Sequence, residues 1–262
     1  MSYTDYERDM LELVADFSAN GIPLVFKGGL VTKTYLLSNG QEQVTRNTVD
    51  IDANLAGNTD FFELCEMIGQ VIGKRIPDAE IRVKRIPAAN MTGRVEIVKD
   101  NNPLYSLDID PIHPTMHLAE ITIGDTKIPC VEPEQIIADK ISAISAPVVF
   151  RRSKDLIDLY GLSRCTSFST QEIRQIVEDS GHRLGDFGKL IGERANVEHA
   201  YERLRGVVEK PPFSEVYDQI LRIIEPFVRE PDRNLLWDPV ECDYSLELDR
   251  DDYDDSEEDL ER

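Results

Sequence analysis

The hydrophobic pattern of this 262-residue sequence changes at Pro133. Before Pro133, short apolar runs with the two-residue alternation of β-strands lie among helical segments. After it, apolar residues recur at the three- and four-residue spacing of helices, and a proline suits the first turn of a helix. The pattern predicts an α/β (α+β) fold, in which a small mixed sheet flanked by helices is followed by a helical C-terminal half.

The same pattern sets the boundaries of the expected elements. Strands are expected at residues 22–27, 48–55, 94–99, 104–112, 117–123 and 127–131. Helices are expected at residues 5–19, 28–37, 60–73, 133–145, 153–163, 170–180, 187–205 and 213–229. We therefore expect a sheet-containing core at 1–131 and a helical region at 132–237, and the groove between them is a natural ligand site.

The net charge of −21 is concentrated at the C-terminal end. Residues 238–262 hold 13 of the 50 acidic residues and only two arginines. Such a segment is expected to be a solvated, disordered tail. A sharper hypothesis is that it covers a nucleic-acid site on its own protein. The overall acidity argues against nucleic-acid binding unless a local basic patch overrides it.

The cysteines and the apolar segments bear on location. The four cysteines are scattered without a C-x-x-C pair, so neither a zinc site nor a disulfide framework is indicated. The sequence shows neither a signal peptide nor an apolar run long enough to span a membrane. We expect a cytoplasmic protein without a membrane partner.

The run RNTVDIDANL, residues 46–55, contains Asp50 and Asp52 one residue apart. In a strand both carboxylates face the same side, where two like charges need a positive partner. Neighbouring carboxylates suit Mg²⁺, which takes oxygen ligands and bridges to substrate phosphates. An exposed strand end explains the pair equally well.

Two further features lie in the first half of the chain. Lys27, Gly28 and Gly29 stand where a strand meets a helix, and paired glycines let backbone amides approach a phosphate, although they are also common in tight turns. Asp108 and Asp110 repeat the two-residue spacing. An acid beside the first pair would complete a two-metal site and accept a proton from an attacking hydroxyl, whereas a solvent-facing strand edge is the alternative.

The fourth feature lies in the helical half. Lys140 is expected on the helix that begins at Pro133, and Asp155 and Asp158 share a face of the next helix. A lysine suits the charge of a triphosphate. The alternative is a salt bridge between the two helices.

Taken together, the segments FKGGLVTKTYL, RNTVDIDANL, EPEQIIADKISAI and RRSKDLIDLYGL resemble the AbiEii/AbiGii-type toxin family of nucleotidyltransferases, within the DNA polymerase beta-like superfamily. The resemblance covers residues 20–165, and four motifs in order are far more specific than any one. One departure is Leu30, which stands where the superfamily often has a serine or threonine. Thr32 lies nearby.

The resemblance implies a role for each matching residue. Nucleotide binding is expected from Lys27, Gly28, Gly29, Arg46, Thr48 and Lys140, and catalysis from Asp50, Asp52, Asp108, Lys140 and Asp155. Asp50, Asp52 and Asp108 would bind Mg²⁺ or Mn²⁺. We choose Asp108 over Asp110 because Asp110 precedes a proline at the strand end.

The family also implies a toxin of a toxin–antitoxin or phage-defence system, with an NTP as substrate, the tRNA 3′ end as acceptor and a cognate antitoxin as a possible partner. Two basic stretches could follow RNA phosphates, although each is equally explained as a solvated face. They contain Lys74, Arg75, Arg82, Lys84 and Arg85, and Arg151, Arg152 and Lys154. The alternatives are transfer to a small molecule such as an antibiotic, transfer to a protein, and a non-catalytic binding protein with this fold.

Overall fold

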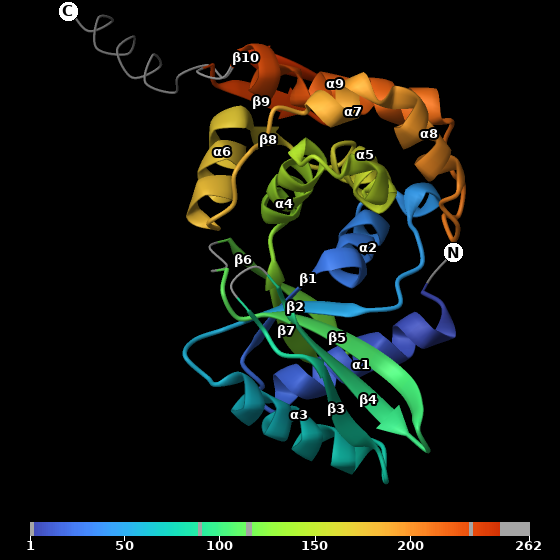
Figure 1. The fold of residues 1–262 in the computed structure, drawn as a ribbon, viewed down its shortest axis with the longest axis vertical. Coiled ribbons are helices and arrows are strands. Elements are labelled where there is room, and N and C mark those ends of the chain that lie inside the picture. Colours follow the sequence, from blue (N-terminus) through green and yellow to red (C-terminus); the bar gives the residue numbers. More distant parts are fainter. Residues whose placement is uncertain (1–2, 89–90, 114–116, 231–232, 247–262) are drawn as a thin grey trace, which may run out of the picture.

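The computed structural model describes residues 3–88, 91–113, 117–230 and 233–246. A mixed sheet with helices on both faces forms the first half, and a helical region with a small sheet at its outer end forms the second (Figure 1). The predicted fold class is confirmed.

The large sheet has seven strands in the order β3-β4-β5-β2-β1-β7-β6. Its centre is mixed, because β1 runs antiparallel to β2 and parallel to β7, while β2 runs parallel to β5. The strands are β1 (Leu24–Lys27), β2 (Ile51–Leu55), β3 (Glu80–Arg85), β4 (Gly93–Lys99), β5 (Asn102–Asp110), β6 (Leu118–Ile123) and β7 (Thr126–Val131).

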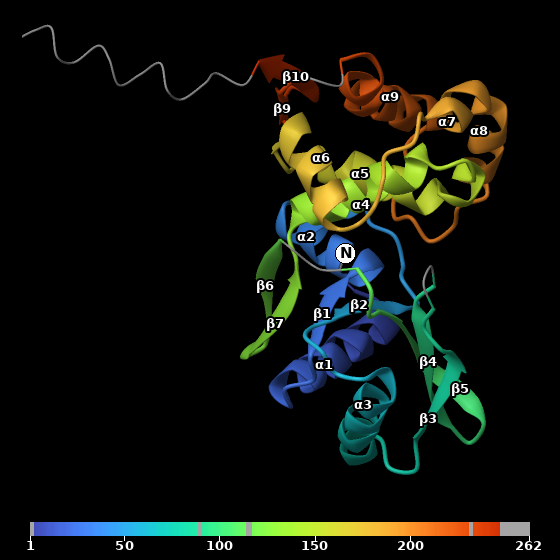
Figure 2. The same ribbon diagram turned by 60° about the vertical axis from the view of Figure 1, so that its left-hand side comes forward.

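The two faces of this sheet carry different residues. The apolar side chains of β2 and β5, such as Ile51 and Leu107, are fully buried, and the aspartates alternate with them on the opposite face. Helices α1 (Asp5–Ala19) and α3 (Phe61–Arg75) pack on one face of the sheet, and α2 (Gly28–Ser38) lies on the other, beneath the helical region (Figures 1 and 2).

The helical region begins at Pro133, in the first turn of its first helix, as predicted. Its helices α4 and α5 contact α2 and so join the two halves of the molecule. The helices are α4 (Pro133–Ser145), α5 (Ser153–Leu162), α6 (Thr170–Asp179), α7 (Gly188–Gly192), α8 (Arg194–Glu202) and α9 (Phe213–Arg229).

The structure divides one expected helix and adds one strand to the large sheet. The helix expected at 187–205 is two short helices, α7 and α8, separated at Glu193. Strand β3 was not expected, because the stretch 73–85 was interpreted only as a basic segment. In the structure Ile81 and Val83 alternate with its charged residues and pack against the core at the edge of the sheet.

Ordered structure also extends into the acidic C-terminal segment. Strands β8 (Phe168–Ser169), β9 (Leu235–Asp238) and β10 (Asp243–Leu246) form a second sheet in the order β10-β9-β8. Trp237 is fully buried in it and donates a hydrogen bond from Nε1 to the carbonyl of Ser163 at 2.6 Å. The expected disorder therefore does not hold for residues 238–246, and residues 247–262 lie outside the described part of the chain.

Candidate active site

The turn between β1 and α2 is built around its two glycines. Gly28 has a φ of +70°, and a Cβ atom there would lie 2.0 Å from Oδ2 of Asp52. A Cβ atom on Gly29 would lie 2.8 Å from Oγ1 of Thr48. The amide of Gly29 donates a hydrogen bond to the Asp52 carboxylate. No other residue type could therefore bring the N-terminus of α2 so close to the aspartate strand.

The aspartates lie side by side on the face of the sheet that carries α2. Asp52 on β2 and Asp108 on β5 are direct neighbours in the parallel register, and Asp50 is two residues before Asp52. Burial, and then the Asp108 charge, raise the pKa of Asp52, although Lys27 opposes the shift. Burial raises the pKa of Asp108 as well, against the opposing charges of nearby arginines.

These arginines are Arg94 on β4 and Arg85 on β3. Arg94 donates from Nη2 to Oδ1 of Asp50 at 3.0 Å and from Nη1 to Oδ2 of Asp108 at 3.1 Å. Arg85 donates to Oδ1 of Asp108 at 3.0 Å. We call Asp50, Asp52, Asp108, Arg85 and Arg94 the sheet cluster. The sequence analysis missed both arginines in this role.

Asp110 belongs to a separate group of contacts. It neighbours Asn54 in the register, lies 3.6 Å from Nζ of Lys27 and 2.8 Å from Nδ1 of His113, and accepts hydrogen bonds from the amides of Ile112 and His113. Burial alone would raise the pKa of Asp110, but these amides and Lys27 hold it below its usual value. The position beside Asp52 is therefore that of Asp108, and the choice of Asp108 over Asp110 as a site residue stays a prediction.

The helical half contributes a second group around Lys140. Nζ of Lys140 lies 2.8 Å from Oδ2 of Asp158 and 3.2 Å from Oδ1 of Asp155, while Arg46 contacts both oxygens of Asp158 at 2.9 and 2.8 Å. We call Arg46, Lys140, Asp155 and Asp158 the helix cluster. Asp158 was recognised only as the helix-face neighbour of Asp155, and that spacing was its only signal.

The charges of the helix cluster stabilise one another. Burial alone would lower the pKa of Lys140, but Asp158 and Asp155 hold it above its usual value. Burial alone would raise the pKa of Asp158, but Lys140 and Arg46 hold it below its usual value. Lys140 and Asp158 are therefore both charged at neutral pH. The predicted salt bridge between two helices is present, and it includes the residue predicted to meet phosphates.

The loop before β2 joins the two clusters. Nη2 of Arg46 would lie 3.1 Å from a Cβ atom on Gly29, so the helix cluster reaches the glycine turn. The amide of Thr48 donates to Oε1 of Glu7 at 3.0 Å, and Glu7 forms a buried ion pair of 2.6 Å with Lys33. The predicted site residues thus lie in one region, and Glu7 and Lys33 fix the loop that carries Arg46, Thr48 and Asp50.

Other predicted contacts are not free for a ligand. Thr32 is buried and donates to the carbonyl of Gly28 at 2.8 Å, so it does not replace the hydroxyl that Leu30 lacks. In the stretch 73–85, four cations already have acidic partners. The ion pairs are Arg75 with Glu12 and Asp16, Arg82 with Glu80, Lys84 with Glu96, and Arg85 with Asp108.

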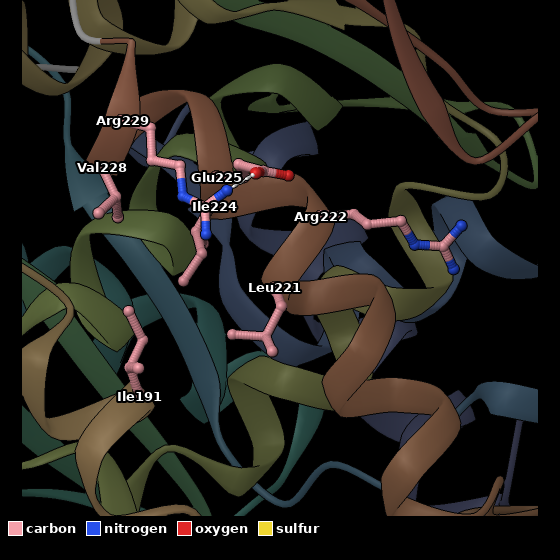
Figure 3. A pocket seen from close by; sticks show the side chains of 7 residues that line it. All are labelled: Ile191, Leu221, Arg222, Ile224, Glu225, Val228 and Arg229. Atoms are coloured by element: carbon pink, nitrogen blue, oxygen red, sulfur yellow. Dashed lines mark hydrogen bonds and ion pairs between the residues drawn. The ribbon is translucent and has the colours of Figure 1, made fainter.

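A cavity of about 250 Å³ lies elsewhere, between α7 and α9 (Figure 3). Its lining is mostly apolar, with the Glu225–Arg229 ion pair of 2.6 Å at its edge. None of the residues that line it belongs to either cluster. It is therefore separate from the candidate site.

The carboxylates beside the glycine turn meet only part of what a divalent cation needs. Within the described ranges, no group of three or more histidine, cysteine, aspartate or glutamate side chains is arranged to hold a metal ion. Asp50, Asp52 and Asp108 do not fit a three-ligand metal site, because Arg94 lies between Asp50 and Asp108. Mg²⁺ is often bound by only one or two protein carboxylates, with phosphates and water as its other ligands. Asp50 and Asp52 fit this smaller ligand set.

The sequence matches the family described as "Nucleotidyl transferase AbiEii toxin, Type IV TA system" over residues 11–239. The chain belongs to this family. The AbiEii resemblance of the four motifs is thereby confirmed, and the protein is a nucleotidyltransferase of a toxin family. No curated protein sequence matches the chain. In the part of the AbiEii chain that the structure describes, every helix is too short or too polar to cross a membrane.

Solved structures similar to this AbiEii protein include three nucleotidyltransferase-type proteins. MenT4, a nucleotidyltransferase toxin from Mycobacterium tuberculosis H37Rv, is 16% identical with a TM-score of 0.46, covering 94% of this chain and 84% of its own. An antigenic nucleotidyltransferase-like protein from Paracoccidioides brasiliensis is 15% identical with a TM-score of 0.45, covering 82% and 97%. The Megavirus polyadenylate synthase is 11% identical with a TM-score of 0.39, covering 92% and 46%.

Proposed function

We propose that this AbiEii-family protein transfers a nucleoside monophosphate from an NTP to the 3′-terminal hydroxyl of tRNA, in a reaction that requires Mg²⁺ or Mn²⁺. In this role it acts as the toxin of a toxin–antitoxin or phage-defence system. One observation carries the proposal. The glycine turn, the Asp50–Asp52 pair and the Lys140–Asp155 pair come from distant parts of the sequence and meet at the junction of the two halves.

The triphosphate would bind at the N-terminus of α2. The first amides of this 11-residue helix and its dipole favour an anion. Arg46 and Thr48 border Gly29 on one side, and Lys27 precedes the turn. These residues would orient the α-phosphorus toward the acceptor.

Asp50 and Asp52 would hold the divalent cation. Bound there, Mg²⁺ or Mn²⁺ would neutralise phosphate charge and orient the triphosphate. Asp108 neighbours this pair, and its raised pKa makes it a stronger base than an ordinary aspartate. We assign it the proton of the acceptor hydroxyl, which Oδ1 of Asp108 would accept after Arg85 releases it. The hydroxyl oxygen attacks the α-phosphorus while pyrophosphate leaves.

Lys140 would meet the negative charge that develops on the leaving pyrophosphate. Asp158 fixes its ammonium group at 2.8 Å, and Arg46 fixes Asp158 in turn. Of the two carboxylates that contact Lys140, Asp155 is more exposed than Asp158. The contact with Asp155 would therefore open first and let Nζ of Lys140 reach the phosphates. A positively charged group held in place before the reaction is worth more than one that must be reoriented.

The test is incubation of the purified protein with Mg²⁺, each α-labelled NTP in turn, and total tRNA. Label on tRNA from the wild-type protein, and its loss in Asp52→Asn, would support the proposal and identify the nucleotide. Asp125→Asn is the matched control, because Asp125 is an exposed aspartate in the β6–β7 turn. Label that persists in Asp52→Asn would contradict the assignment of the site.

A small cationic acceptor, such as an antibiotic, is the second candidate. It is favoured by the net charge of −21 and by the ion pairs that occupy most cations of the stretch 73–85. Replacing tRNA by a cationic antibiotic in the same assay separates the two acceptors. Labelling of the protein itself, or no label from any NTP, would point to a protein acceptor or a non-catalytic binding protein.

A further inference from the structure

Arg94 occupies an unusual place for a guanidinium group. Its two terminal nitrogens contact one oxygen of Asp50 and one oxygen of Asp108, at 3.0 and 3.1 Å. These are two of the three carboxylates that a two-metal nucleotidyl-transfer site would use. The side chain that joins them is therefore a resident cation at the position where a shared divalent cation would bind.

The contact follows from the sheet itself. Arg94 on β4 is the antiparallel register partner of Asp108, so both side chains lie on the same face of the sheet. Arg85 reinforces the arrangement from β3, because it contacts the other oxygen of Asp108 and is anchored on Thr92 by two hydrogen bonds of 2.6 and 2.7 Å. Both oxygens of Asp108 thus have a guanidinium partner.

The charge balance points the same way. Four carboxylates on this face, Asp50, Asp52, Asp108 and Asp110, are met by the three cationic side chains Lys27, Arg85 and Arg94. Without substrate, one divalent cation would more than balance the remaining negative charge. Because an arginine cannot lose its proton at any working pH, this positive charge is permanent.

We propose that Arg94 takes the place of a second divalent cation, so that Asp108 is not a metal ligand and the site binds one divalent cation, on Asp50 and Asp52. Asp50 would offer to that cation the oxygen that Arg94 leaves free. This deepens the proposed function and rests on it only for the identity of the bound substrate, because cation binding itself can be measured without nucleotide or acceptor.

The test is the number of Mn²⁺ ions bound per chain, measured without substrate by electron paramagnetic resonance of the free ion. We expect Arg94→Gln to bind one Mn²⁺ more than the wild-type protein at the same free concentration. The double variant Arg94→Gln/Asp108→Asn should return to the wild-type number. Arg82→Gln is the matched control, since Arg82 is an arginine of similar exposure on β3 that contacts Glu80 instead. Equal numbers in Arg94→Gln and wild type would overturn the proposal.

Asp108→Asn alone gives an independent measurement should Arg94→Gln fail to fold. Because Asp108 is not a ligand in our proposal, this nearly isosteric variant should bind as many Mn²⁺ ions as the wild-type protein, with an affinity within about threefold. Loss of a bound ion would overturn the proposal. A failure of the proposed function would instead appear as wild-type Mn²⁺ binding without any nucleotidyl transfer, so the two failures are distinguishable.

Discussion

The sheet cluster and the helix cluster pair carboxylates with cations in opposite surroundings. In the helix cluster the side chains of Asp158 and Lys140 are only 2% and 8% exposed, whereas in the sheet cluster those of Asp50 and Arg94 are 32% and 35% exposed. Water reaches the exposed pair in the sheet cluster and screens its attraction. A ligand can therefore replace one of the two partners at little cost. The buried pair cannot lose a partner without leaving an unmatched charge. The helix cluster therefore holds its cations in fixed positions, whereas the sheet cluster can exchange a partner for a ligand.

Asp158→Ala should cause the largest loss in the free energy of unfolding. It leaves Arg46 and Lys140 buried without their shared carboxylate, and breaking a buried ion pair in this way costs about 3–5 kcal/mol. The change in the free energy of unfolding, measured in urea, tests this. Asp155→Ala is the matched control on the same helix, and its loss should be about 1 kcal/mol because Asp155 is more exposed. Equal losses would show that the deeper burial of Asp158 does not set the size of the effect.

Asp52→Asn should affect activity and stability in opposite directions. The raised pKa of Asp52 means that the fold disfavours its ionised form, so a neutral side chain of the same size should leave the unfolding temperature at pH 7 unchanged or higher. Transfer of labelled nucleotide should fall on the order of 10³-fold, as when a preorganised charge is removed from an active site. A clear drop in unfolding temperature would show that Asp52 is a structural residue.

The pH dependence of stability should follow the helix cluster. The pKa of Asp158 is lowered in the folded state, so its contribution is complete above the usual aspartate value and is lost as the pH falls through the lower, folded-state value. The stability difference between wild type and Asp158→Asn should therefore be constant above about pH 5 and shrink below about pH 4. Urea denaturation across that range measures it. A stability difference that grows on acidification would contradict a lowered pKa of Asp158 in the folded state.

Removal of residues 247–262 should have the smallest effect. If this acidic segment covers an RNA site, the shortened chain should bind tRNA more tightly at low salt, and the gain should disappear at high salt. The deletion keeps β10, whereas a cut before Asp238 would also remove a strand that pairs with β9. Fluorescence anisotropy with labelled tRNA at two salt concentrations measures the change, and equal affinities at low salt would refute the covering role.

The parts of the fold that sequence predicted are those specified locally. The helix that begins at Pro133, the Gly28–Gly29 turn and the Asp50–Asp52 strand each follow from neighbouring residues. Strand β8 is only two residues long and pairs with β9, nearly seventy residues away, so no local pattern indicates it. Burial of Trp237 then orders the start of a segment whose composition alone predicts disorder.

The same distinction applies to the candidate site. The motif residues could be named because their types and order resemble those of a family. The partners of those residues could not, because Arg94 reaches Asp108 through strand register and Arg46 reaches Asp158 across 112 residues of sequence. Which cation meets which carboxylate is a property of the tertiary structure.

The parallel register of β2 and β5 has a consequence for folding. Asp52 and Asp108 are paired on one face, while Ile51 and Leu107 are paired on the buried face. A slip of one residue in either strand would turn its charged side chains into the apolar layer and expose its apolar ones. The aspartates therefore help to specify the register of the central strands during folding. They disfavour the registers shifted by one residue, and they do so before any substrate is present.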